Sequence, residues 1–159
     1  PIPYRITNNY YPNEVATAQV LVEMWRAAGL RVRVEMAENV AMQERPEGRA
    51  LTSNSATSFF PDPVASPWRI FGPTGPIQAR LRAWSNAEFN RLGQVLEQSV
   101  DTVERRQVWS RMLGILDADP PALILHANGH FHGKRASVRW APAGRTLSMD
   151  FRRESLSFA

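Results

Sequence analysis

Residues 12–36 read PNEVATAQVLVEMWRAAGLRVRVEM, and two hydrophobic periods follow one another in this stretch. Apolar side chains recur at helical spacing from Val15 to Ala28, which predicts an amphipathic helix whose first turn is capped by Asn13. Gly29 can end that helix in the left-handed conformation that residues with a Cβ resist. Apolar and charged residues then alternate over 30–36, which is the period of a half-buried strand.

A shorter apolar stretch before this helix completes a supersecondary unit. Tyr4, Arg5 and Ile6 are expected to form a first strand, so that residues 4–36 give a strand, a helix and a second strand. Such a unit makes a parallel strand pair with a right-handed crossover in most proteins. Residues 51–60 are rich in Ser and Thr and are a candidate for one more strand. The sequence therefore predicts the α/β class.

The segment that follows is dominated by proline. Five prolines and two glycines fall between positions 61 and 76, and proline removes backbone donors and biases its predecessor away from helix. A long irregular segment in a small domain is more often functional than a short turn.

Two amphipathic helices are predicted next, and each begins with a capping box. Ser85 is expected to pair with Glu88, and Asp101 with Glu104, because the side chains satisfy each other's first backbone donors. Both helices are expected to pack on the sheet, and the second one stops before Pro120. The apolar run 122–126 is suited to a buried strand, and the remainder offers one or two edge strands.

Charge and cysteine content exclude several classes of function. The chain has 19 Lys and Arg against 15 Asp and Glu, a net charge of +4, but the arginines are scattered and not gathered between exposed aromatic residues. This distribution argues against nucleic acid as a partner. The absence of cysteine excludes disulfides, thiolate metal sites and a cysteine nucleophile.

Five motifs in one order resemble a known family. They are the helix and strand of residues 15–35, Phe60-Pro61-Asp62-Pro63, Trp84-Ser85-Asn86-Ala87-Glu88-Phe89, Asp101 with Glu104-Arg105-Arg106, and the run 116–125. Together they are similar to the second lobe of family 5 extracellular solute-binding proteins, the peptide/nickel/opine-type substrate-binding proteins of ABC transporters. The resemblance covers about three quarters of the chain.

The resemblance implies a fold, a location and partners. Residues 1–159 would form a single domain, one lobe of a type II periplasmic-binding-protein fold with a sheet flanked by helices, and the amino-terminal lobe would lie upstream. The two lobes would close around a peptide or related small polar ligand in the periplasm or another extracytoplasmic space. The closed form would be presented to an ABC permease in the inner membrane. No cofactor and no bond chemistry are implied.

The same resemblance points to a ligand-binding loop. Peptide-binding members use a carboxylate in this region to hold the ligand's amino group, so Asp62 is the first candidate ligand contact. The alternative is that Asp62 only initiates a turn before Pro63. The aromatic side chains of the loop either line the cleft or fill the core; they are Phe59, Phe60, Trp68 and Phe71. Arg69 and Arg80 either meet an anionic group or lie solvated on the surface.

Two alternative functions remain at this point. The first is a free-standing metal-assisted hydrolase, in which His126, His130 and His132 converge on zinc or nickel. Their spacing matches no strong metal signature, and no Gly-x-Ser-x-Gly, phosphate-binding Gly-rich loop or His-Glu-x-x-His motif occurs. The second is an interaction domain, because an isolated lobe would expose an apolar patch where its other lobe sits.

Overall fold

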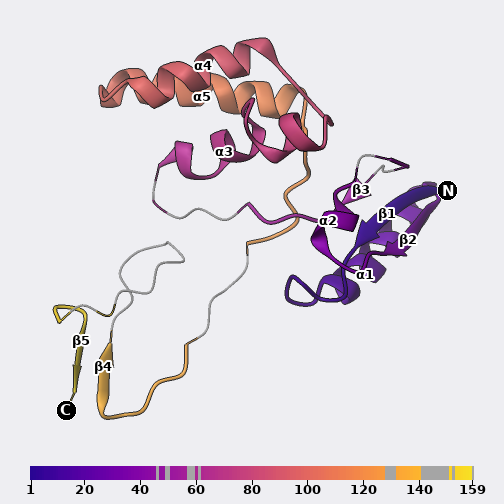
Figure 1. Cartoon of the computed structure of the whole chain (residues 1–159), viewed down its shortest axis with the longest axis horizontal. Helices are drawn as coiled ribbons and strands as arrows, with labels where there is room; N and C mark the ends of the chain where they lie inside the picture. Colours follow the sequence, from indigo (N-terminus) through magenta and orange to yellow (C-terminus); the bar gives the residue numbers. More distant parts are fainter. Residues whose placement is uncertain are drawn as a thin grey trace.

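The structure is a computed structural model that describes residues 1–45, 47–48, 51–56, 60, 62–127, 132–140, 151 and 153–158. It is mixed α/β, with small sheets flanked by helices. Along the chain lie a sheet part, a helical part and a hairpin, shown in order from indigo to yellow in Figure 1. The expected α/β class is therefore confirmed.

The sheet part contains the strand, helix and strand that the sequence predicts. Its elements are β1 (Ile2–Ile6), α1 (Glu14–Ala27), β2 (Val32–Met36), α2 (Val40–Gln43) and β3 (Leu51–Thr52). All three strands are parallel in the order β2-β1-β3, and Tyr4 is in register with both Val34 and Leu51. Of the candidate stretch 51–60, the structure describes residues 51–56 and 60, and among these only Leu51 and Thr52 form a strand.

Helix α1 covers the face of the sheet that carries Tyr4 and Ile6. Ala18 is fully buried against these two residues, and the Tyr4 and Trp25 rings meet edge to face at 5.3 Å. Gly29 ends the helical segment with φ of 84°, as predicted. The predicted cap is wrong: Asn13 itself has φ of 57° and makes no side-chain cap bond. Because the chain turns sharply before α1, Asn9 Oδ1 reaches the Val15 amide instead, at 3.1 Å.

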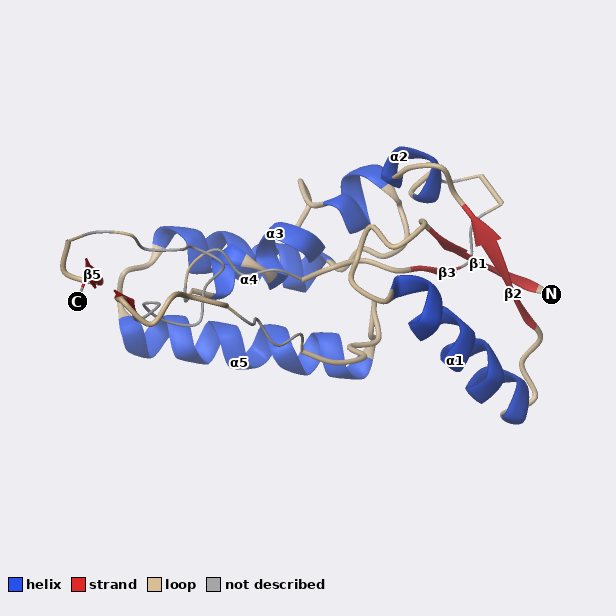
Figure 2. Ribbon diagram, turned by 90° about the horizontal axis from the view of Figure 1, so that it is seen from below, coloured by secondary structure: helices blue, strands red, loops and turns tan. Residues whose placement is uncertain are grey.

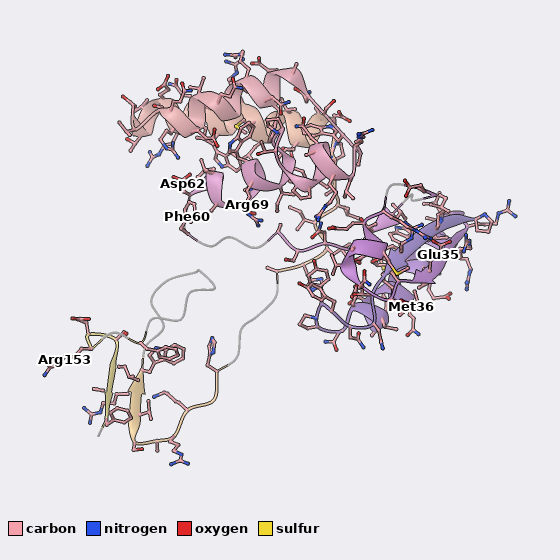
Figure 3. The ribbon with its side chains drawn as sticks, viewed as in Figure 1. Glu35, Met36, Phe60, Asp62, Arg69 and Arg153 are labelled. Carbon is pink, nitrogen blue, oxygen red and sulfur yellow. The ribbon has the colours of Figure 1, made fainter. Side chains whose placement is uncertain are left out.

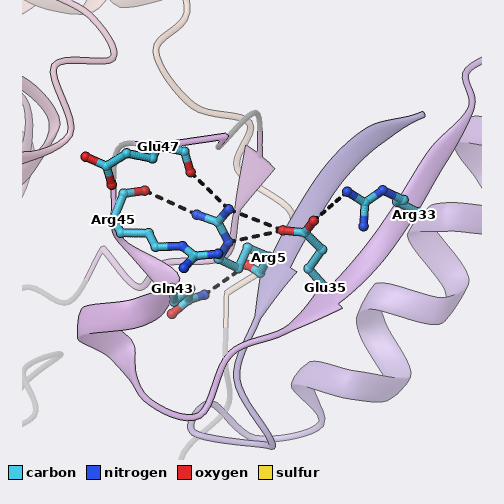
Figure 4. Close-up of polar contacts among 6 residues, drawn as sticks. All are labelled: Arg5, Arg33, Glu35, Gln43, Arg45 and Glu47. Carbon is cyan, nitrogen blue, oxygen red and sulfur yellow. Dashed lines mark hydrogen bonds and ion pairs between the residues drawn. The ribbon is translucent and has the colours of Figure 1, made fainter.

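The opposite face of β1 carries a buried arginine. Arg5 is paired with Glu35 of β2 at 3.2 Å, and its guanidinium also donates to the carbonyls of Arg45 and Glu47 (Figure 4). A buried charge is tolerated where a partner charge and hydrogen bonds replace its hydration. Arg5 therefore fixes the loop after α2 to the centre of the sheet.

The helical part contains a 3₁₀ turn η1 (Pro63–Ala65), α3 (Pro67–Phe71), a π-helical turn η2 (Pro76–Arg80), α4 (Ala87–Gln98) and α5 (Thr102–Ala118). The prediction that α4 and α5 pack on the sheet is wrong. Their apolar faces pack against each other and against α3, and this cluster, among the described residues, contains no residue of the sheet. The core residues of this cluster are Trp68, Phe89, Leu92, Leu96, Val108 and Met112.

The predicted capping boxes form only in part. The cap of α4 is Asn86, whose Oδ1 accepts from the Phe89 amide at 2.9 Å, while Glu88 pairs with Arg91. The α4 box is therefore wrong by one residue. At α5 the prediction is half correct, because Asp101 Oδ1 accepts from the Val103 and Glu104 amides, at 2.7 and 3.0 Å. The side chain of Glu104 bonds to Ser99 Oγ and does not close the box.

The predicted strand at 122–126 does not form. Leu123 and Ile124 are 73% and 87% exposed, and no strand edge among the described residues pairs with them. A strand needs a neighbouring strand to bond its backbone amides and carbonyls, and residues 122–126 have none among the described residues. The predicted edge strands near the end are present as the antiparallel hairpin β4 (Val138–Trp140) and β5 (Leu156–Phe158). Within the described ranges, no helix combines the length and apolar character that crossing a bilayer requires.

Candidate functional site

The three parallel strands contain a topological switch point. The chain leaves β1 through α1 to reach β2 on one side, then returns through α2 to place β3 on the other side of β1. Figure 2 shows α1 and α2 on opposite sides of the sheet, as this winding requires. In open α/β sheets, ligands bind outside the carboxyl ends of the strands at such a point. The candidate site is therefore where β1 and β3 end.

A buried amide ties the two strands together beneath this point. Gln43, the last residue of α2, is 1% exposed, and its Nε2 donates to the Arg5 carbonyl at 3.3 Å and to the Ser53 carbonyl at 3.0 Å. One carbonyl belongs to β1 and the other to the residue after β3. The separation of the two carboxyl ends is thus fixed by a side chain that solvent does not reach.

A buried carboxylate fixes the loop that follows β1. Glu14 accepts from Thr7 Oγ1 at 2.6 Å, from the Thr7 amide at 3.2 Å and from the Tyr11 amide at 3.5 Å. Gln43 Nε2 lies 3.4 Å from the same carboxylate. Four donors at one buried carboxylate hold the loop 7–11 in one conformation.

The surface of the site is made of amides, hydroxyls and phenol rings. Tyr11 Oη donates to Asn54 Oδ1 at 3.2 Å, which joins the loop after β1 to the loop after β3. Tyr10 is exposed and meets Tyr11 edge to face at 4.9 Å, and Asn8 and Asn9 are exposed beside it. Exposed amides offer donors and acceptors in pairs, and an exposed phenol ring offers a flat apolar face.

Two phenols of the site are shielded from solvent, with Tyr4 buried and Tyr11 half-buried. Burial raises the pKa of Tyr4 and the pKa of Tyr11 above the ordinary tyrosine value. The Tyr4 hydroxyl shares a hydrogen bond with Ser53 Oγ at 2.5 Å. Both rings therefore serve as neutral hydrogen-bonding groups that position the loops.

Asp62 lies in the helical part, away from this sheet edge. Figure 3 places Asp62 and Phe60 beside the helices, apart from Glu35 and Met36 of β2. Both carboxylate oxygens of Asp62 face Arg105 Nη2, at 2.8 and 2.6 Å, and Oδ1 also accepts from the Val64 amide. Asp62 therefore caps the turn that begins at Pro63, and its role as a ligand contact stays a prediction.

Arg105 connects this ion pair to the end of α4. Its Nη1 donates to the Ser99 carbonyl at 2.9 Å and also contacts the Leu96 carbonyl. The start of η1, the end of α4 and the first turns of α5 are therefore joined by one guanidinium.

The aromatic candidates of the loop divide into buried and exposed groups. Trp68 is buried in the helical core, 6.0 Å from the Phe89 ring, and Phe71 is half-buried with its ring edge on Trp84. Phe60 is exposed, and Phe59 lies outside the described residues.

The two arginine candidates make contacts within the chain. Arg69 Nε donates to the Ala65 carbonyl at 3.1 Å. Arg80 Nη2 lies 2.6 Å from Glu44 Oε2, an ion pair whose alignment is not that of a hydrogen bond. It links the helical part to the residue that follows α2.

The histidines of the metal hypothesis lie in the segment after α5. His126 and His132 are exposed, and His132 rests edge to face on Trp140 at 5.2 Å, while His130 lies outside the described residues. In the part of the chain that the structure describes, no group of three or more His, Cys, Asp or Glu side chains is placed to hold a metal ion.

A basic hollow is present in the hairpin. A cavity of about 370 Å³ is lined there by three cationic side chains, an aromatic ring and four further residues: Lys134, Arg139, Arg153, Trp140, Glu154, Ser155, Leu156 and Ser157. It contains none of the residues that the sequence singled out.

Sequence reasoning missed the residues at the sheet edge. Asn8 lies two positions after the predicted strand of residues 4–6, which is the signal that could have found the loop 8–11, whereas Asn54 lies inside the candidate stretch 51–60 and carried no such signal. The strand order that makes this edge a switch point was not predictable, because it depends on which side of β1 the third strand pairs. No family model matches the chain, and no curated protein matches it by sequence.

Proposed function

We propose that this chain is a ligand-capturing lobe of an extracytoplasmic solute-binding protein of the peptide/nickel/opine type. It would close with a second lobe around a small polar ligand and present the ligand to an ABC permease, without bond chemistry. One observation carries the proposal. The carboxyl ends of β1 and β3 form a switch point whose scaffold is fixed by Gln43 and Glu14 and whose surface is rich in neutral hydrogen-bonding groups.

The chemistry of this surface favours reversible capture. Asn8 offers an exposed amide, and Asn9 and Asn54, whose Oδ1 atoms accept from groups of the chain, offer amide donors to a peptide bond or a polyol. Tyr10 offers an apolar face beside them. The buried groups beneath are already bonded to one another, so the site is pre-organised and little ordering is needed on binding. These features support a neutral, amide-bearing or hydroxyl-bearing ligand.

Two contacts join the sheet part and the helical part, which favours their movement as one lobe. Beyond Ala56 the chain passes from the sheet part to the helical part, and Ser66 Oγ donates to the Ala56 carbonyl at 3.1 Å. The Arg80–Glu44 ion pair joins the same two parts. A ligand that contacts both a sheet edge and a second lobe shifts an open and closed equilibrium by its differential affinity for the two states.

A thermal-shift screen of the 159-residue chain against peptides, opines, sugars and metal chelates tests the proposal. A ligand of the native state raises the unfolding temperature by mass action. We expect one class to give a saturable rise that Tyr10→Ala and Asn54→Ala remove. Phe158→Ala, at another exposed aromatic residue, is the matched control and should keep the rise. Turnover of a substrate that depends on added zinc, with no shift in the screen, would favour the hydrolase instead.

The ligand role of Asp62 stays a prediction and needs its own design, because the carboxylate also supports the fold. In an Arg105→Met background the ion pair is already lost, so Asp62→Asn removes charge without breaking that pair. A further loss of ligand affinity in this background would show direct contact. An unchanged affinity would assign Asp62 to structure alone.

A further inference from the structure

The outer edge of β2 is an unpaired strand edge. The Ile2 amide donates to the Arg31 carbonyl and the Ala37 amide to the Ile6 carbonyl, both at 2.7 Å. Positions 31 and 37 therefore point their backbone groups toward β1, and by alternation so do the odd positions between them. The amides and carbonyls of Val32, Val34 and Met36 point outward, where no strand of the described residues pairs with them.

This edge is apolar on one face and charged on the other. Val34 is 37% and Met36 56% exposed on the face that α1 covers incompletely. The other face carries Arg33 and Glu35, whose side chains are 2.6 Å apart. An exposed apolar edge strand is a template for pairing with another chain.

We propose that β2 pairs with β2 of a second copy of this chain, antiparallel and centred on Val34. In this register Val34 faces Val34 of the second copy, and Val32 faces Met36, so every outward backbone group finds a partner. These are the hydrogen-bonded pairs of an antiparallel ladder. The two apolar faces then form one continuous surface across the joined sheets.

Charge complementarity selects this register over its neighbours. Arg33 faces Glu35 of the second copy in a non-hydrogen-bonded pair, where side chains approach most closely, and the symmetric pair repeats the contact. A register centred on Val32 would place Arg31 opposite Arg33 of the second copy, and a parallel in-register pairing would place like charges opposite each other. Both arrangements are disfavoured by repulsion.

Sedimentation velocity of the full chain over a concentration series tests the proposal. We expect a reversible monomer and dimer equilibrium, which Val34→Pro weakens at least about tenfold because two central hydrogen bonds are lost. The Val34 amide is not bonded to β1, and proline is tolerated on edge strands, so circular dichroism should show an intact fold. Val34→Thr keeps the amide and should dimerise like the parent chain.

A second pair of variants tests the register without proline. Arg33→Glu places two acidic side chains opposite each other and should weaken the dimer about tenfold. Arg31→Glu makes the same charge change opposite Ala37 and should have little effect. A chain that stays monomeric throughout the series would overturn the proposal. Arg31 and Arg33 would then be charged residues that keep the edge of β2 from pairing with another chain. Equal effects of Arg33→Glu and Arg31→Glu would overturn it as well.

Discussion

At the scale of single residues, the contact between Gly93 and Trp68 shows how one missing side chain organises the helical part. A Cβ built at position 93 would lie 2.1 Å from Trp68 Cζ3, so the indole can lie against α4 only because this residue is glycine. Trp68 in turn packs beside Phe89 in the same core. The geometry of α3 on α4 therefore depends on a pair of residues 25 positions apart in the numbering of the chain.

Gly93→Ala is expected to destabilise the chain despite the better helix propensity of alanine. The added methyl group forces the indole out of its position, and overpacking of this kind costs about 1–3 kcal/mol. The measurement is the free energy of unfolding in urea. Gly114→Ala on α5 is the control, because nothing lies within 4 Å of its new Cβ, and it should be neutral or stabilising by up to about 1 kcal/mol. Equal effects of the two substitutions would contradict the packing described for Trp68.

Sequence reasoning at this scale succeeded where the cause is local. The left-handed Gly29 and the turn role of Asp62 depend on their immediate neighbours and were predictable. The place of Trp68 was not, because it depends on a helix that packs across it. The same applies to Gln43, whose importance comes from carbonyls on two strands that the sequence does not show to be adjacent.

At the scale of elements, the first turn of α5 has a charged cap that titrates. Hydrogen bonds from the Glu104 and Val103 amides lower the pKa of Asp101 below its ordinary value. A lowered folded-state pKa means that the cap stabilises the fold above the unfolded-state pKa, and that this stabilisation is lost as pH falls through the folded-state pKa.

Asp101→Asn should therefore lower the unfolding temperature at neutral pH, and by less as the pH falls through the acidic range. Asparagine still accepts the two amide bonds but lacks the charge that favours a helix start. The comparison is a series of thermal unfolding curves for both chains between neutral and acidic pH. A difference that stays constant over the whole series would contradict the pKa shift of Asp101.

The loop after α2 depends on Arg5. Its guanidinium bonds to Glu35 and to two loop carbonyls (Figure 4), so Arg5→Met leaves the two carbonyls without this donor, while Glu35 keeps its ion pair with Arg33. We expect a loss of about 1–3 kcal/mol in the free energy of unfolding, because part-buried carbonyls lose hydrogen bonds from a charged donor. Arg26→Met is the control, because the exposed Arg26–Glu23 pair contributes within about 0.5 kcal/mol. A similar small effect of Arg5→Met would show that the loop is held by other contacts.

Element prediction failed where pairing partners decide the outcome. Helices α4 and α5 and the strand, helix and strand unit follow from periodicity within one stretch and were predicted, whereas α3 formed inside the segment that was expected to be irregular. The run 122–126 has the composition of a strand, but a strand also needs a neighbour, and composition does not supply one. Strand β3 covers only Leu51 and Thr52 for a related reason, because only Tyr4 and Arg5 of β1 pair with it.

At the scale of the whole molecule, the helical part and the sheet part bury their apolar residues in two separate clusters. The core of α3, α4 and α5 closes on itself, and the core of β1 and α1 is a second cluster. The expected layering of these helices on the sheet is the largest difference from the sequence prediction. The prediction failed because an amphipathic stripe shows that one face of a helix is buried but does not show which element buries it. The ion pair of Arg80 with Glu44 joins the two parts without merging their cores.

We propose the carboxyl ends of β1 and β3 as the binding site for a small polar ligand. Amide chemical-shift mapping by NMR tests it most directly, with the isotope-labelled 159-residue chain titrated with the class that the thermal-shift screen selects. We expect saturable shifts at Asn8, Tyr10, Tyr11 and Asn54, with the hairpin amides unchanged. Saturable shifts confined to the hairpin around Trp140, with none at the sheet edge, would contradict it.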